Sequence, residues 1–129
     1  MIHEEICTYE VAKSAKEKGF DVQTFDWYDY TGNYYKGLIP HELHECPRYK
    51  EYYAPTQSLL QRWLREENGY AISVTAYPTL ATMGKVCYAW EIKSSSDGHY
   101  MKAVDGEYTF STYELALEDA LKYALENLV

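Results

Sequence analysis

Residues 55–77, PTQSLLQRWLREENGYAISVTAY, join a helical pattern to a strand pattern through a glycine. The helical part has one apolar stripe at a period of 3.6 residues, formed by Leu59, Leu60, Trp63 and Leu64. Pro55 or Thr56 can begin this helix, because proline is tolerated in the first turn and threonine can cap it. We therefore predict an amphipathic helix that packs on a core.

The same stretch predicts where the helix ends and a strand begins. Asn68-Gly69 can end the helix, since glycine readily adopts the left-handed conformation found there. From Tyr70 the pattern alternates, with Ile72 and Val74 on one side and Ser73 and Thr75 on the other. This period of two is typical of a half-buried strand.

The chain continues with patterns for more strands and a last helix. Residues 85–93 and 99–104 alternate as strands, and polar turns separate them. Ser111 and Glu114 fit a capping box, and Phe110 and Leu115 stand where a hydrophobic staple would pack. Residues 54–129 are therefore predicted to form an α-β-β-β-α unit with an antiparallel three-stranded sheet.

The N-terminal part contains a thinner helical pattern and a turn. Residues 8–18 predict a helix that Thr8 caps and Gly19 ends. Aromatic, β-prone runs on both sides of residues 31–33 predict a β-hairpin, and residues 41–53 predict a loop or a short helical turn. The predicted fold class is α+β. We expect residues 1–53 to pack on residues 54–129 in a single domain.

Composition restricts the compartment and the partners. The 129 residues are 47% hydrophobic, enough to bury a core, and the net charge is −8, which disfavours direct binding to nucleic acid. No apolar run reaches the roughly 20 residues of a membrane span, and MIHEEICTYE at the start contains no apolar signal core. The 3 cysteines are far apart, which is typical of a reducing cytoplasm. We expect a cytoplasmic protein that does not bind membranes.

Three stretches resemble a group of uncharacterised small proteins encoded in prophages and mobile elements of gut Bacteroidetes. They are TYEVAKSAKEKGF at 8–20, APTQSLLQRWLREENGYAISV at 54–74 and FSTYELALEDALKYALENL at 110–128. The resemblance covers most of the chain outside residues 26–53. It implies a phage or mobile-element origin and a location in the bacterial cytoplasm, and it implies no activity and no site residues.

The sequence shows no set of residues that predicts catalysis. His41, His44 and Cys46 are weak candidates for a metal site, because their spacing matches no standard zinc motif. Cys7 precedes a helix, whose dipole could lower the pKa of the thiol, but no base accompanies it. Neighbouring acids such as Glu118 and Asp119 are expected to lie on solvated helix faces. We expect no enzyme, no bound metal and no cofactor.

Tyrosine is unusually frequent, with 15 residues, and either covers a sheet or forms a recognition surface. The candidate partner-binding residues are Tyr28, Tyr30, Tyr34, Tyr35, Tyr52 and Tyr53. Our leading hypothesis is a non-enzymatic phage or mobile-element accessory protein that acts through protein–protein contacts. The alternative is an acidic mimic of nucleic acid that inhibits a host defence or DNA-binding protein. An exposed sheet edge leaves both a monomer and a homodimer possible.

Overall fold

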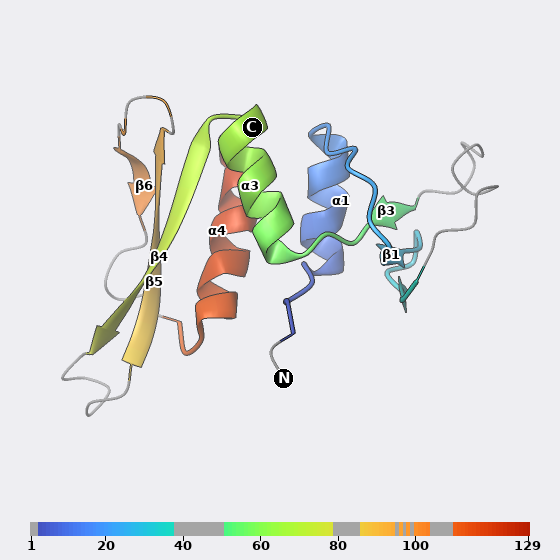
Figure 1. Cartoon of the computed structure of the whole chain (residues 1–129), viewed down its shortest axis with the longest axis horizontal. Coiled ribbons are helices and arrows are strands. Elements are labelled where there is room, and N and C mark those ends of the chain that lie inside the picture. The colour runs from blue at the N-terminus through green and yellow to red at the C-terminus, as the bar shows by residue number, and fades with distance from the viewer. Residues whose placement is uncertain are drawn as a thin grey trace.

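The computed structural model describes residues 3–37, 51–78, 86–94, 96, 98, 100–103 and 110–129. In this part of the chain, helices α1 (Tyr9–Glu17), α3 (Gln57–Glu67) and α4 (Tyr113–Asn127) accompany two antiparallel sheets (Figure 1). The predicted α+β class is confirmed. The candidate metal ligands His41, His44 and Cys46 lie outside the described residues.

The larger sheet has the strand order β4-β5-β6, with β4 at Tyr70–Pro78, β5 at Val86–Ser94 and β6 at Tyr100–Ala103. All neighbours are antiparallel, and Ile72 of β4 is paired with Ile92 of β5. Both side chains are buried on the face that the helices cover. The predicted three-stranded antiparallel sheet is confirmed, and its strands occur in the predicted order.

The elements are arranged in layers. Helices α3 and α4 lie against one face of the larger sheet, α1 lies on their other side, and a smaller sheet lies beyond α1 (Figure 1). One core runs through the helices and the larger sheet, and its largest buried side chains come from segments distant in sequence: Val11, Leu60, Leu64, Ile92, Leu121 and Leu125. Burial of these side chains is the main favourable contribution to this arrangement.

Threonine caps all three of the described helices. Thr8, Thr56 and Thr112 have extended backbones, and each hydroxyl accepts a hydrogen bond from the amide three residues later. Our prediction of Ser111 as the cap of α4 is wrong by one residue, since Thr112 accepts the hydrogen bond from the Leu115 amide. Leu115, which we predicted to pack in a hydrophobic staple, is 54% exposed.

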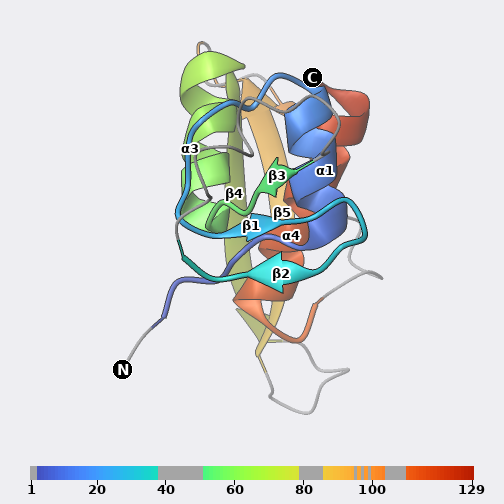
Figure 2. The same cartoon turned by 90° about the vertical axis from the view of Figure 1, so that its right-hand side faces the viewer.

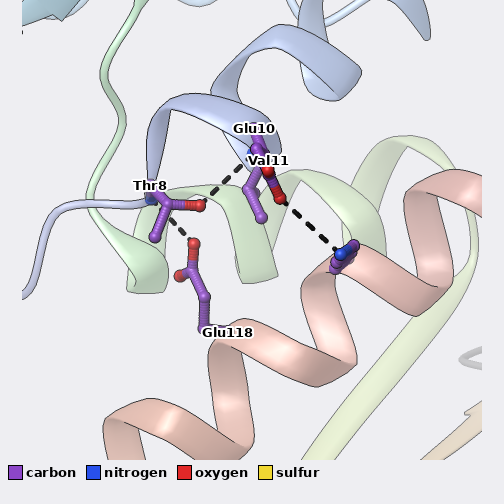
Figure 3. Close-up of polar contacts among 5 residues, drawn as sticks. Thr8, Glu10, Val11 and Glu118 are labelled. Atoms are coloured by element: carbon purple, nitrogen blue, oxygen red, sulfur yellow. Dashed lines mark hydrogen bonds and ion pairs between the residues drawn. The ribbon is translucent and has the colours of Figure 1, made fainter. Parts of the chain in front are cut away.

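Glu118 of α4 joins the beginnings of the other two helices. One carboxylate oxygen accepts a hydrogen bond from the Thr8 amide at 2.7 Å (Figure 3), and the other accepts one from Gln57 Nε2 at 2.9 Å. Next to it, Asp119 accepts a hydrogen bond from the Trp90 indole at 2.8 Å. Our expectation of solvated carboxylates is therefore wrong here, because both side chains are half-buried acceptors between elements.

The smaller sheet has the order β2-β1-β3, with β1 at Trp27–Tyr28, β2 at Tyr34–Tyr35 and β3 at Tyr52–Tyr53. The pairing of β1 with β2 confirms the predicted hairpin. Our prediction of a loop or helical turn at 41–53 is wrong at Tyr52–Tyr53, which pair with β1. These strands are too short for a detectable alternating pattern, so tertiary contacts decide their structure.

Within the described residues, no helix combines the length and the apolar composition that crossing a bilayer requires.

Candidate partner-binding surface

The smaller sheet consists entirely of aromatic residues arranged in two rows. Strand pairing aligns Tyr28 with Tyr34 and Tyr52 across the sheet. It likewise aligns Trp27 with Tyr35 and Tyr53, and these form the second row. Because neighbouring residues in a strand point to opposite faces, each row lies on its own face. Figure 2 shows this sheet in front of α1.

The first row fixes the sheet to α1 through Tyr9. The Tyr9 ring meets the rings of Tyr28 and Tyr52 edge-on, with 5.7 Å between the ring centroids in each pair. Tyr28 Oη donates a hydrogen bond of 2.6 Å to the Cys7 carbonyl. Tyr52 is only 5% exposed, and Lys16 Nζ lies 5.2 Å from the centre of its ring. The rings of Tyr28 and Tyr52 are therefore engaged within the molecule.

The second row contains a stacked pair. The rings of Trp27 and Tyr35 are 4.3 Å apart and inclined by only 14°. Tyr53 is half-buried and packs against the edge of the core. Burial raises the pKa of Tyr53, and the carboxylates of Glu51 and Asp21 raise it further. Negative charge therefore lies beside this row.

Several aromatic side chains of this region are open to solvent. Phe25 is 70% exposed, Tyr30 63%, Tyr34 44% and Tyr35 41%, and Trp27 is half-buried beside them. We call these five residues the aromatic surface. It extends around the edge strand β2, because Tyr34 lies on the face toward α1 and Trp27 and Tyr35 lie on the opposite face. It lies at the end of the molecule opposite the larger sheet (Figure 1). Aromatic rings exposed together on a monomer often mark a contact site, since exposure of apolar area to water is unfavourable.

A hydrogen-bonded turn holds the tip of the hairpin. The Asp29 carboxylate accepts hydrogen bonds from the amide and hydroxyl of Thr31, from the amide and side chain of Asn33, and from Tyr35 Oη. These donors, with the Thr31 hydroxyl the strongest, hold the pKa of Asp29 well below its usual range. Tyr30 is held at this tip, since Tyr9 Oη donates a 3.0 Å hydrogen bond to its carbonyl.

Gly32 allows this turn to approach α1. Its φ of +92° is unfavourable for residues with a side chain, and a Cβ at this position would lie 3.3 Å from the Tyr9 ring. The turn therefore packs closely against Tyr9 of α1.

A second carboxylate bonds a tyrosine of the aromatic surface. Asp26 accepts a 2.6 Å hydrogen bond from Tyr34 Oη and a 3.2 Å hydrogen bond from the Gly37 amide. Burial and the hydrogen bond to Asp26 raise the pKa of Tyr34 to about 12. The hydrogen bond to Asp29 raises the pKa of Tyr35 in the same way. The tyrosine hydroxyls thus stay protonated at neutral pH, beside carboxylate charge.

The cysteines do not provide a second site in the described residues. Cys7 and Cys87 are buried. Burial raises the pKa of the Cys7 thiol, and the charges of Glu118 and Glu5 raise it further. The helix-dipole effect that the sequence suggested is therefore outweighed. No group of three or more His, Cys, Asp or Glu in the described ranges has the geometry of a metal site.

The structure divides the tyrosines that we predicted to contact a partner. Tyr30, Tyr34 and Tyr35 are exposed, Tyr28 and Tyr53 are half-buried, and Tyr52 is buried. Sequence reasoning missed Phe25 and Trp27 as members of the aromatic surface. Their alternation with Asp26 was a usable signal, because it places both rings on one side of an extended segment.

Comparisons with models of protein families, with curated proteins and with solved structures found no match to this chain.

Proposed function

We propose that this chain is a non-enzymatic, cytoplasmic accessory protein of a phage or mobile element, and that it binds another protein through the aromatic surface. The exposure of Phe25, Tyr30, Tyr34 and Tyr35 at one end of the molecule carries this proposal. The resemblance of residues 8–20, 54–74 and 110–128 to prophage proteins supports the origin.

Local order in part of the aromatic surface supports a role in binding. Trp27 and Tyr35 are stacked, and the Asp29 network fixes the turn that carries Tyr30. Side chains that are ordered before binding lose little conformational entropy when a partner arrives. Tyrosine adds to this advantage, since its ring contributes a large contact area with few rotatable bonds.

Charge supports a protein partner over a nucleic acid. The carboxylates of Asp26 and Asp29 lie at the rim of the aromatic surface, and the whole chain carries −8. Phosphate groups are repelled by such a rim, whereas Lys and Arg side chains are attracted to carboxylates and to ring faces. The proposed partner therefore presents apolar residues together with positive charges.

The test compares two double variants as baits in a pull-down from a Bacteroidetes lysate. Phe25→Ser with Tyr30→Ser removes the two most exposed rings of the aromatic surface, and no ring contact or side-chain hydrogen bond is described for either residue. Tyr113→Ser with Leu115→Ser is the matched control, because these side chains are 41% and 54% exposed on α4. We expect a protein that wild type and the control retain and that the Phe25/Tyr30 variant loses by at least tenfold.

Equal retention by both variants would contradict the aromatic surface as the binding site. A DNA-binding protein retained equally by both variants, and released by salt, would instead favour the acidic mimic of nucleic acid. Circular dichroism of each variant establishes that lost retention is not lost folding.

A further inference from the structure

The larger sheet has a long edge whose backbone orientation can be worked out. Strand β4 is the first strand of the order β4-β5-β6 and extends over 9 residues, so one side of it faces no described strand. On the other side of β5, Tyr88 exchanges two backbone hydrogen bonds with Phe110, each of 2.8 Å. The amide and carbonyl of Tyr88 therefore point away from β4.

This orientation determines which residues of β4 have backbone amides and carbonyls that point away from β5. Tyr88 is the partner of Ala76, so this pair is not hydrogen-bonded. In an antiparallel ladder, hydrogen-bonded and non-hydrogen-bonded pairs alternate. The amides and carbonyls of Ala76, Val74 and Ile72 consequently point out of the sheet edge.

Two independent features agree with this assignment. Pro78 has no N–H and, by the same alternation, occupies an outward position, where proline costs no hydrogen bond to β5. The Ile72 carbonyl accepts a 2.9 Å hydrogen bond from Nε2 of Gln61, a residue of α3. This carbonyl therefore already has a partner outside the strand ladder.

No described strand pairs with this edge, and its side chains carry no charge. Ser73, Thr75, Ala76 and Tyr77 are exposed, and Val74 is half-buried. The sequence YAISVTAYP of β4 contains no Lys, Arg, Asp or Glu, although charged residues are the usual protection of an exposed edge strand. An uncharged edge is noteworthy on a chain whose net charge is −8.

We propose that β4 pairs antiparallel with β4 of a second copy of this chain, with Thr75 opposite the Thr75 of the other copy. In this register Val74 faces Ala76 of the other copy, and the two exchange amide-to-carbonyl hydrogen bonds. Ile72 faces Pro78 of the other copy and donates to its carbonyl. The larger sheets of both copies become one continuous sheet.

This register leaves no outward backbone group without a partner between residues 72 and 78. Pro78 lacks an N–H, and the carbonyl that it faces, that of Ile72, already accepts from Gln61. Centring the contact on Val74 instead would place the Ala76 amide against that same carbonyl. The donors and acceptors of the edge therefore fit a second copy centred on Thr75, and an isologous contact of this kind closes as a dimer.

The side chains fit the same register. Ser73, Thr75 and Tyr77 share the face of β4 that points away from the helices, since Ile72 and Val74 pack toward the core. The register places Thr75 against Thr75 and Ser73 against Tyr77 of the other copy. Cross-strand pairs of this kind stabilise sheets, and none of them opposes like charges.

Disulfide cross-linking tests the register, in a background with Cys46→Ser and Cys87→Ala. Thr75→Cys places two sulfurs at a non-hydrogen-bonded pair, where Cα atoms lie about 4.5 Å apart, which a disulfide spans. Ser73→Cys is the matched control, because this residue is exposed on the same face but lies about 13 Å from its counterpart. We expect rapid formation of a covalent dimer with Thr75→Cys and at least tenfold slower formation with Ser73→Cys.

Light scattering of the wild type tests the association itself. We expect a mass of twice the 15.1 kDa of one chain at micromolar concentrations. If the measured mass stays that of a single chain at concentrations up to about 0.5 mM, any association is far weaker than ordinary specific association, and the proposal is overturned. Equal cross-linking of the two cysteine variants would overturn it as well. Neither result depends on the aromatic surface, which lies at the opposite end of the molecule.

Discussion

At the scale of single residues, Asp29 orders part of the candidate site. Its carboxylate accepts hydrogen bonds from Thr31, Asn33 and Tyr35, and so orders both the turn and one exposed ring. The side chain is at the surface, so water screens its charge, and the order comes from the geometry of the hydrogen bonds.

We predict that Asp29 stays ionised as the pH falls through about 3.9, the ordinary value for aspartate. The folded pKa is depressed, so the stabilisation from this group is complete above the ordinary pKa and is lost as the pH falls toward the folded pKa. NMR titration of the Asp29 carboxyl carbon measures this. Thr31→Ala removes the strongest donor and should raise the pKa. An ordinary titration of wild-type Asp29 would contradict the network.

At the scale of elements, α4 acts as the support for the beginnings of α1 and α3. Its Glu118 accepts from the Thr8 amide and from the side chain of Gln57, which is only 5% exposed. Gln57 also donates to the Glu114 carbonyl at 2.9 Å. Figure 3 shows Glu118 reaching the first turn of α1, where Glu10 forms an ion pair with Lys122 of α4.

We predict that Glu118→Ala lowers the free energy of unfolding by about 1–3 kcal/mol, because it removes an acceptor from two donors, of which Gln57 is buried. Urea unfolding measures the change. Glu126→Ala is the matched control on the same helix, since its side chain is exposed, and it should change stability by less than about 0.5 kcal/mol. If both substitutions changed the free energy of unfolding equally, the hydrogen bonds of Glu118 to Thr8 and Gln57 would make no measurable contribution to stability.

At the scale of the whole molecule, one core contains residues from both halves of the sequence. Val11 and Phe20 pack in the same buried cluster as Leu60, Ile92 and Leu121. The smaller sheet is attached to this core through Tyr28, whose ring contacts Tyr9 and whose hydroxyl bonds the Cys7 carbonyl, and through Tyr53, which packs against the core.

We predict that residues 1–53 and 54–129 unfold together. In a variant with Trp63→Phe and Trp90→Phe, Trp27 is the only tryptophan and reports on the smaller sheet. Its fluorescence and the far-ultraviolet circular dichroism of the same variant should show one common urea midpoint, as expected for two-state unfolding of a single domain. An earlier fluorescence transition would show that the smaller sheet unfolds separately from the core.

Much of the fold could be predicted from the sequence where the signals act locally. The stop at Gly69, which has a φ of +80°, and the alternation from Tyr70 gave the correct helix and strand. The start of α4 was less secure, because Ser111 and Thr112 are both capable caps and only the backbone conformation decides between them. The aromatic surface was predicted in part, since exposed and buried tyrosines look alike in sequence.

Local patterns in the sequence were enough to predict the helices, the long strands and the uncharged character of β4. These follow from periodicity, caps and glycines within a few residues, and such interactions do not require distant segments. Packing between distant segments decides that Tyr52 is buried, that Glu118 bonds a residue 110 positions away, and that the backbone amides and carbonyls of Ile72, Val74 and Ala76 point out of the edge of the larger sheet. The physical reason is that burial and hydrogen-bond partners depend on packing between elements, whereas propensity depends on neighbours along the chain.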